Sequence, residues 1–299
     1  MKRKMTTWEL RITNQEKDNL VKVQKARKVV RDFLEKRNFL EVDIPVIFSS
    51  KSLLYGGIPV SGQIINGYLC AVMTPFIRRW LALGKECELS RVYFIGKCFR
   101  DEEVNQDHYP VFENLAIGVL GENYQFLMSL IQEMVSDILK IAGPKSIGEW
   151  RSIPYSQLSP KTDFSNIKVN DEEALKEYSE LTSVLISPTF VTKLPVQLFG
   201  PARKITQQTK ERAELFINGI EIGNISTFLT NVEELSRWYQ EQSIDFNQYI
   251  LEKEHLDSVS TLNGEIIATG AIGLSRLYMI LFGLNTIKET IAFPYFGGD

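Results

Sequence analysis

The spacing of apolar and polar residues divides the chain into segments of different predicted structure. In residues 21–37 the apolar positions recur every three or four residues, with Lys and Arg between them, which predicts a helix with one buried face. Residues 39–48 alternate as a strand does, up to Pro45, which has no N–H for a sheet ladder. Residues 123–143 repeat the helical spacing and close on Gly143. We therefore expect two amphipathic helices, with a short strand after the first.

Three further segments contain strand patterns. Residues 90–100 form an apolar run that predicts a buried strand, and residues 213–229 predict two strands joined at the hairpin dipeptide Asn218-Gly219. Residues 264–284 pass from small residues into an apolar helix pattern. Strands interleaved with helices and hairpins indicate an α+β fold, built on an antiparallel or mixed sheet flanked by helices.

The domain organisation follows from where these patterns are strong. We expect residues 21–299 to form one domain and residues 1–20 to be an N-terminal extension. Residues 145–205 are polar and proline-marked with weak periodicity, which indicates an insertion or a small subdomain within that domain.

Composition and charge narrow the possible partners. With 44% apolar and 24% charged residues the chain has the composition of a globular protein. Its formal charge of −3 and pI of about 5.7 provide no general attraction for nucleic acid, so any polyanion must be held by a local cluster of cations. The sequence contains no apolar run of the roughly 18 residues that a membrane span needs, and we expect a cytoplasmic protein without membrane contact.

The cysteines and one of the two histidines have structural interpretations. Cys70, Cys87 and Cys98 show no C-x-x-C spacing, so we expect buried free thiols rather than a zinc site or disulfides. His255 follows acidic residues in a helical pattern, and we expect it to be solvent-exposed near a helix end.

Residues 98–115 contain the first candidate site. If they form a strand, a turn and a return strand, Arg100 and Phe112 face one cleft, where an arginine binds phosphate oxygens and an aromatic ring stacks on a purine. Glu102 can accept from the amine of a base, and His108 can bind a terminal phosphate. The alternative interpretation is a charged hairpin with a core phenylalanine.

Two acids form the second candidate site. Glu214 and Glu221 flank the Asn-Gly turn, a spacing that brings two carboxylates together from the arms of one hairpin. Both have apolar neighbours, and Mg²⁺ favours one or two carboxylates together with substrate phosphates. The alternative is two surface glutamates on an exposed hairpin.

A run of small residues precedes Arg276 and gives the third candidate site. The small residues allow close backbone approach, and a second guanidinium far in sequence from Arg100 is what a bent triphosphate requires. The alternative is tight packing of a helix on a sheet.

These three segments, in this order, resemble the signature motifs of class II aminoacyl-tRNA synthetases, most closely the subclass that activates lysine, aspartate and asparagine. The segment "FLEKRNFLEVDIPVI" resembles the first motif, which ends at its proline, Pro45. The second resembles "FRDE" followed by "HYPVF", and the third resembles "GAIGLSRL". The segments "NGIEIGN" and "TIKETIAFP" are also similar to this subclass. The resemblance covers Val21 to Pro294 and implies the class II synthetase fold.

The resemblance implies a role for each residue of the second motif. Arg100 would contact the substrate carboxylate and the α-phosphate, and Glu102 the adenine side of ATP. His108 would bind the β- and γ-phosphates, and Phe112 would stack on adenine. The catalytic residues would be Arg100 and Arg276, the latter on the γ-phosphate.

The resemblance also implies the reaction and its metal. Glu221, with Glu214, would hold Mg²⁺ on the phosphates of ATP. The substrate carboxylate would attack the α-phosphorus in line, giving an acyl adenylate and pyrophosphate. No general base is needed, because a carboxylate is ionised at neutral pH.

The substrate side-chain pocket departs from the family pattern. Phe228 stands where the family has a charged residue, Phe76 where it has Gln or Glu, and Val111 where it has an acid. Arg79 keeps a cation where the family has lysine, and Asn224 is expected to line the same pocket. Since several polar positions are apolar here, we expect a substrate with an apolar or aromatic side chain.

The acceptor of the acyl group is the remaining question. Synthetases of this subclass have an N-terminal β-barrel that recognises the anticodon, and only residues 1–20 precede the first motif here. We therefore expect a free-standing paralogue without the anticodon-binding domain that passes the acyl group to a non-tRNA acceptor, such as an amine, ammonia, a protein or a carrier. The alternatives are a minimal synthetase that charges tRNA and a catalytically silent regulatory subunit. The family also implies a homodimer.

Overall fold

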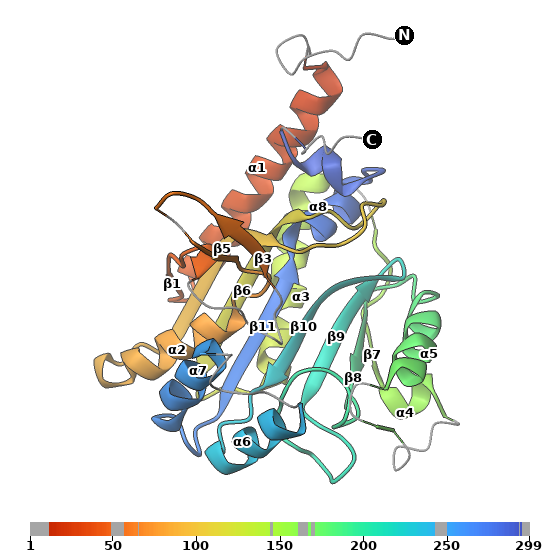
Figure 1. Cartoon of the computed structure of the whole chain (residues 1–299). Coiled ribbons are helices and arrows are strands. Elements are labelled where there is room, and N and C mark those ends of the chain that lie inside the picture. Colours follow the sequence, from red (N-terminus) through yellow and green to blue (C-terminus); the bar gives the residue numbers. More distant parts are fainter. Residues whose placement is uncertain are drawn as a thin grey trace.

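A large mixed sheet organises the molecule, described here by a computed structural model (Figure 1). The structure describes residues 12–48, 57–64, 66–143, 146–160, 167–168, 171–242, 250–292 and 294. Within these ranges the sheet has eight strands in the spatial order β1 (Leu40–Glu41), β5 (Arg91–Phe99), β6 (Val111–Leu120), β11 (Ile267–Gly273), β10 (Ile220–Thr227), β9 (Arg212–Ile217), β8 (Thr189–Thr192) and β7 (Arg151–Pro154). The outermost pairs at each edge are parallel and the five inner pairs are antiparallel. The expected α+β class is confirmed.

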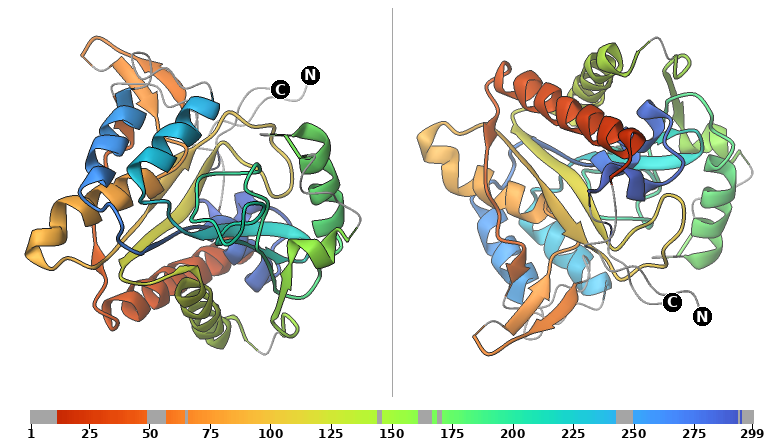
Figure 2. Two further views of the ribbon diagram at one scale, coloured as in Figure 1. Left: turned by 90° about the horizontal axis from the view of Figure 1, so that it is seen from below. Right: turned by 90° about the horizontal axis from the view of Figure 1, so that it is seen from above.

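Helices cover both faces of this sheet (Figure 2). One face packs against α1 (Asn14–Glu35), α3 (Tyr124–Ala142) and α8 (Leu274–Phe282). The other face packs against α2 (Thr74–Gly84), α6 (Val232–Glu241) and α7 (Ile250–Ser260). Smaller elements complete the described chain: α4 (Tyr155–Leu158), α5 (Glu172–Thr182), the 3-10 helices η2 (Lys85–Cys87) and η4 (Ile287–Thr290), and a sheet of β2 (Ile47–Phe48), β4 (Asn66–Leu69) and β3 (Ile58–Ser61).

Helix α1 begins earlier than its apolar spacing predicts. The Thr13 hydroxyl accepts from the backbone N–H of Glu16, and the Glu16 carboxylate accepts from the backbone N–H of Thr13, which is a capping box. This cap starts the helix seven residues before Val21. The buried stripe of α1, which includes Val30 and Phe33, then packs on the sheet as expected.

The turn between β9 and β10 forms at the predicted dipeptide. Asn218 and Gly219 both have positive φ, 54° and 73°, the conformation that a two-residue hairpin requires. A side chain at Gly219 would also collide with the backbone carbonyl oxygen of Ser183, 2.2 Å from its Cβ position. The hairpin pairs Glu221 with Phe216 and Asn224 with Glu214, so the two acids lie on neighbouring strands of one sheet.

The weakly patterned segment 145–205 extends the sheet. Its described part contributes β7 and β8, with α4 and α5 packed beside them around a cluster that includes Tyr155 and Tyr178. Whether it is an insertion stays a prediction, as does the extension at residues 1–20, whose first 11 residues lie outside the described ranges.

Two further findings concern the cysteines and the helices. Cys70 and Cys98 are buried, and burial raises the pKa of their thiols to about 11 and about 12, whereas Cys87 is exposed, contrary to expectation. Of the helices that the structure describes, none has both the length and the apolar composition to cross a bilayer.

Candidate active site

The β5–β6 hairpin brings the first predicted pair together. Arg100 directly follows β5, and its backbone N–H donates to the Pro110 carbonyl across the hairpin, at 3.0 Å. Phe112 is the second residue of β6, and its ring centroid lies 5.2 Å from the guanidinium carbon of Arg100. Glu102 lies on the same side, with its Oε1 3.3 Å from Arg100 Nη1. A cation and an aromatic ring therefore border one space.

The hairpin loop holds His108 beside this pair. The Asn105 carboxamide oxygen accepts from the His108 backbone N–H at 2.8 Å and lies 3.2 Å from the ring nitrogen Nδ1. The Asp107 carboxylate is also 3.2 Å from Nδ1. These contacts orient the imidazole at the rim of the space that Arg100 and Phe112 border.

Arg276, from α8, links this loop to the sheet. Its Nε donates to the Asp107 carbonyl at 2.9 Å, and its Nη1 donates to the Glu221 carbonyl at 3.0 Å. The first cavity, of about 70 Å³, lies between these elements and is lined by Arg100, Glu102, His108, Phe112, Glu221 and Arg276. Six predicted residues that span 177 positions of the sequence thus converge, although their individual roles stay predictions.

The two predicted metal acids differ in their surroundings. Glu221 lines the first cavity, whereas Glu214 is only 2% exposed and accepts from Arg212 Nη2 at 3.0 Å. Burial and the charge of Glu221 raise the pKa of Glu214 to about 7, against the opposing effect of Arg212.

This donor set fits Mg²⁺. A cation beside Glu214 and Glu221 would relieve the repulsion that raises the Glu214 pKa, and Mg²⁺ needs only one or two carboxylates because waters and phosphates fill its other positions. In the described ranges no cluster of three or more His, Cys, Asp or Glu could hold a metal by itself. Metal binding by these two acids stays a prediction.

A second cavity, of about 440 Å³, adjoins the first. The two cavities share Arg100, Asn114, Asn224 and Ala271. The second cavity is also lined by Arg78, Arg212, Ser226 and Thr269. Asn224 thus lies where a residue of the substrate pocket is expected. The lining is mixed, because the three arginines Arg78, Arg100 and Arg212 stand beside apolar residues such as Val72, Phe199 and Trp238, and the expected apolar substrate side chain stays a prediction.

Three other residues predicted for the substrate pocket lie elsewhere. Phe76 stacks on Phe48, with ring centroids 4.3 Å apart. Arg79 Nη1 pairs with the Glu254 carboxylate on α7 at 2.7 Å. Val111 packs against the small cluster around Tyr109. In the part of the chain that the structure describes, none of the three lines either cavity.

The arginine of α2 that lines the second cavity is Arg78, which the sequence pattern did not indicate, and not Arg79. Arg78 is 5% exposed, lines the second cavity, and holds its guanidinium carbon 4.1 Å from the ring centroid of Phe228. Its Nε donates to His255 Nε2 at 2.9 Å, and His255 Nδ1 lies 2.8 Å from the Tyr239 hydroxyl. The ring of Phe228 therefore lies under Arg78, and of these two residues it is Arg78 that lines the second cavity.

The expected exposure of His255 is wrong. The residue is 4% exposed in the core beneath α2. Burial and the neighbouring charge of Arg78 lower the pKa of its imidazole well below the usual value, so the ring is neutral. Because Nε2 accepts from Arg78, the ring proton is on Nδ1 and is donated to Tyr239.

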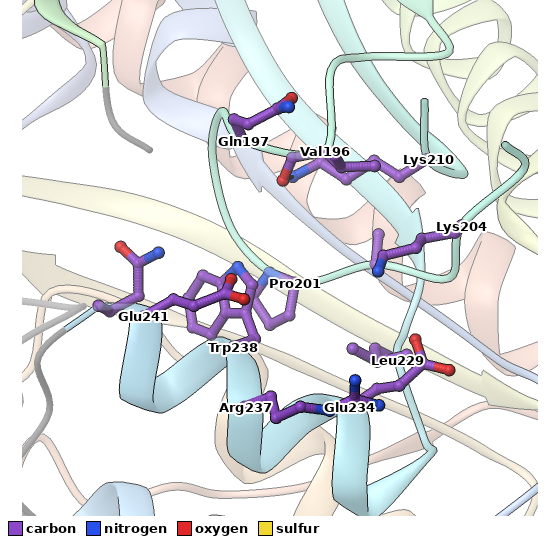
Figure 3. Close-up of a pocket in the computed structure, with 12 residues that line it drawn as sticks. Val196, Gln197, Pro201, Lys204, Lys210, Leu229, Glu234, Arg237, Trp238 and Glu241 are labelled. Atoms are coloured by element: carbon purple, nitrogen blue, oxygen red, sulfur yellow. Dashed lines mark hydrogen bonds between the residues drawn. The ribbon is translucent and has the colours of Figure 1, made fainter. Parts of the chain in front are cut away.

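A third cavity, of about 330 Å³, continues from the second (Figure 3). The two share Pro201, Trp238 and Gln242. Figure 3 shows Trp238 on α6 facing the loop that carries Val196 and Gln197. This loop therefore forms a wall of the third cavity and, at Pro201, of the second.

Lys210 holds that loop in place. Lys210 is 2% exposed, and its Nζ donates to the carbonyls of Val196, Leu198 and Gly200. We expect Lys210→Met to lower the free energy of unfolding by about 2–4 kcal/mol, because three carbonyls lose a charged donor. Urea denaturation measures this change in the free energy of unfolding.

Lys204→Met is the control, since Lys204 lines the same cavity but is exposed, and we expect its free energy of unfolding to change by no more than about 0.5 kcal/mol. Equal effects for both would contradict this account of the loop.

The chain is similar to known proteins along most of its length. Residues 2–296 match the family model described as tRNA synthetases class II (D, K and N). The chain is 28% identical to a lysine–tRNA ligase of Chloroflexus aurantiacus, over 89% of the chain and 62% of that relative. It is 26% identical to a lysine–tRNA ligase of Clostridium perfringens, over 95% and 65%, and 28% identical to lysine–tRNA ligase 2 of Methanosarcina mazei, over 95% and 63%.

The chain spans less than two thirds of the length of these curated relatives. The family model nevertheless covers nearly all of the chain, and within it lie the β5–β6 hairpin, the β9–β10 hairpin and the β11–α8 junction that line the first cavity. The chain therefore belongs to the class II tRNA synthetases of the D, K and N group.

Proposed function

We propose that the protein activates an amino acid with ATP as an aminoacyl adenylate and transfers the aminoacyl group to tRNA. The observation that supports this proposal most strongly is the convergence of Arg100, Phe112, Glu221 and Arg276 on the first cavity. An aromatic ring that can stack on a base, two arginines and a glutamate around one cavity suit the binding of a nucleoside triphosphate. The adjoining second cavity then receives the amino acid, whose carboxylate must reach the α-phosphate.

The chemistry requires little beyond positioning. The amino acid carboxylate is ionised at neutral pH and attacks the α-phosphorus, the bond to the β-phosphate oxygen breaks, and pyrophosphate leaves with the electron pair. Arg100 lines both cavities, so it is placed to contact the carboxylate and the α-phosphate together. Mg²⁺, held by Glu221 and Glu214, would supply neutralisation of the phosphate charge.

The first cavity is small, so ATP can bind there only if it displaces contacts that close the cavity. Arg276 closes it by donating to the carbonyls of Asp107 and Glu221. We infer that bound phosphate replaces these carbonyls as acceptor and that the hairpin loop moves outward with Asp107. The guanidinium then exchanges a neutral acceptor for a charged one, which gives the stronger hydrogen bond.

The acceptor is proposed from the relatives, which are named lysine–tRNA ligases. This differs from the non-tRNA acceptor that we expect from the sequence. The net charge of −3 is the observation that keeps an amine, ammonia, protein or carrier acceptor as the second candidate, because tRNA binding depends on cations that neutralise phosphate.

Two assays test the proposal in sequence. ATP–pyrophosphate exchange, measured with each of the common amino acids in turn, should depend on one amino acid and on Mg²⁺. Transfer of that labelled amino acid to bulk tRNA should then proceed at a rate like that of adenylate formation. Exchange without transfer to tRNA would favour the second candidate. Absence of exchange with every amino acid, in a folded preparation, would contradict adenylate formation.

We also propose that the chain forms a homodimer. Apolar side chains on α1 and on the edge strand β1 are solvent-exposed, with Val21 38% and Leu40 52% exposed. Exposed apolar side chains on α1 and on β1, which is an edge strand among the described residues, are features that a second copy can cover. Sedimentation at equilibrium should give twice the chain mass, and an active species of one chain mass would contradict this.

A further inference from the structure

We propose that Asn114 binds the α-ammonium group of the amino acid substrate through its side-chain carbonyl oxygen, and so selects amino acids over carboxylates that lack this group. The inference rests on the proposed function, because it assigns a residue to substrate recognition in the same site. The sequence pattern did not indicate Asn114.

Asn114 lies on β6, an inner strand of the large sheet. Its side chain points to the same face of the strand as Phe112, two residues earlier, because successive side chains of a strand alternate between faces. Its register partners are Gly96 on β5 and Gly273 on β11, which have no side chains, so none stands directly opposite the amide. The residue lines both the first and the second cavity.

The carbonyl oxygen of this amide has no partner among the residues that the structure describes. Asn114 is 4% exposed, and its Oδ1 is buried without a hydrogen bond. Burial raises the pKa of the neighbouring Cys98 thiol, and a hydrogen bond with the Asn114 side chain opposes this effect. A bond that stabilises a thiolate is donated to it, and Nδ2 is the donor of the amide. Oδ1 is therefore left as a buried acceptor, which is costly unless a ligand satisfies it.

The proposed reaction places the α-ammonium group near this oxygen. Arg100 lines both cavities and is proposed to contact the carboxylate that attacks the α-phosphorus. A single carbon atom joins that carboxylate to the α-ammonium group, so the ammonium group must also lie where the two cavities meet. Of the four described residues that the cavities share, Asn114 and Asn224 are the two whose side chains can accept a hydrogen bond. Asn224 is less buried, so water can satisfy its amide without a substrate.

A neutral acceptor suits this position. A carboxylate would attract the ammonium group more strongly, but it would also repel the nearby substrate carboxylate and the phosphates of ATP. An amide oxygen accepts a charge-assisted hydrogen bond without that repulsion. By the family resemblance, a Gln or Glu of the substrate pocket stands where this chain has Phe76, which stacks on Phe48 and lines neither cavity in the described structure. Asn114 supplies an acceptor that Phe76 does not.

A comparison of the substrate with its deamino analogue tests the inference, because the analogue lacks only the α-ammonium group. The probes are the best amino acid of the exchange panel and its analogue, which is ε-aminocaproate for lysine, phenylpropanoate for phenylalanine or succinate for aspartate. ATP–pyrophosphate exchange gives the KM of the amino acid and the inhibition constant of the analogue as a competitor. For the native protein we expect the analogue to bind at least about 10-fold more weakly.

Asn114→Leu has a side chain of similar shape without the oxygen. We expect the KM of the amino acid to rise by about 10- to 100-fold, the range for one hydrogen bond to a charged group, and the inhibition constant of the analogue to change by less than about threefold. Asn19→Leu is the matched control, because Asn19 is a buried asparagine, 1% exposed, that lies on α1 and lines neither cavity. We expect this control to leave the ratio of the two constants unchanged. A structural role of Asn114 would weaken the amino acid and the analogue equally, and that result would overturn the inference.

Asn114→Asp tests the same contact in the opposite direction. The variant keeps an acceptor oxygen and adds a negative charge, which attracts the ammonium group and repels the carboxylate of the analogue. We therefore expect the preference for the amino acid over the analogue to increase by at least about 10-fold. If Asn114→Leu does not fold, this variant decides alone, and an unchanged preference would refute the role of Asn114. If no amino acid supports exchange by the native protein, it is the proposed function that fails.

Discussion

Replacing Arg276 by alanine is expected to lower kcat/KM for ATP in amino-acid-dependent pyrophosphate exchange by about 1,000-fold. The guanidinium lines the first cavity and donates to the Asp107 and Glu221 carbonyls, so the substitution removes a preorganised cation and the link between the hairpin loop and β10. The radiolabel exchange assay over a range of ATP concentrations measures the effect.

Two further variants make this test specific. Arg276→Lys keeps the charge but cannot span two acceptors, and we expect it to recover only part of the activity. Arg151→Ala removes an exposed arginine at the start of β7, the far edge strand, and should leave exchange unchanged. Activity of Arg276→Ala within a few-fold of the native protein would show that the third motif does not bind ATP.

Replacing Glu221 by glutamine is expected to lower exchange by at least about 100-fold and to raise the Mg²⁺ concentration needed for half-maximal rate. Glutamine keeps the shape of the side chain in the first cavity but removes the charge that would hold the metal. Exchange measured across a Mg²⁺ titration tests both effects. Glu233→Gln, at an exposed position in the first turn of α6, is the control. A normal Mg²⁺ requirement in Glu221→Gln would place the metal elsewhere.

Short-range sequence signals predicted the elements that build the first cavity. The Asn218-Gly219 dipeptide set the β9–β10 hairpin because both residues tolerate positive φ. The apolar run before Arg100 gave β5, and the small residues before Arg276 gave the β11–α8 junction. Each signal lies within a few residues of the structure it determines, and local chain geometry alone is enough to form it.

Apolar spacing alone predicts the N-terminus of α1 at Val21, seven residues after the residue where the helix begins. The capping box of Thr13 and Glu16 was available in the sequence as a T-x-x-E pattern. Segment 145–205 was harder to predict, since its cluster joins Tyr155 and Tyr178 to Phe216 on β9, and contacts between residues so far apart leave no periodic signal.

The burial of Arg78 could be predicted from the sequence, whereas its contact with His255 could not. Thr74, Ile77 and Leu81 form the buried stripe of α2, and Arg78 falls on that stripe whereas Arg79 does not, so helical spacing could have identified the buried arginine. Its partner His255 is 177 positions away on α7, and only the packing of α2 against α7 brings the two together.

One measurement tests the central claim most directly, that the first cavity binds ATP so that a carboxylate attacks the α-phosphorus. Protein is mixed with an excess of ATP labelled at the α-phosphate, together with Mg²⁺ and the best amino acid of the exchange panel, and the quenched products are separated. We predict that the label appears as aminoacyl adenylate at close to one per active site, with unlabelled pyrophosphate released. Label in ADP, or no turnover by a folded protein, would contradict the account.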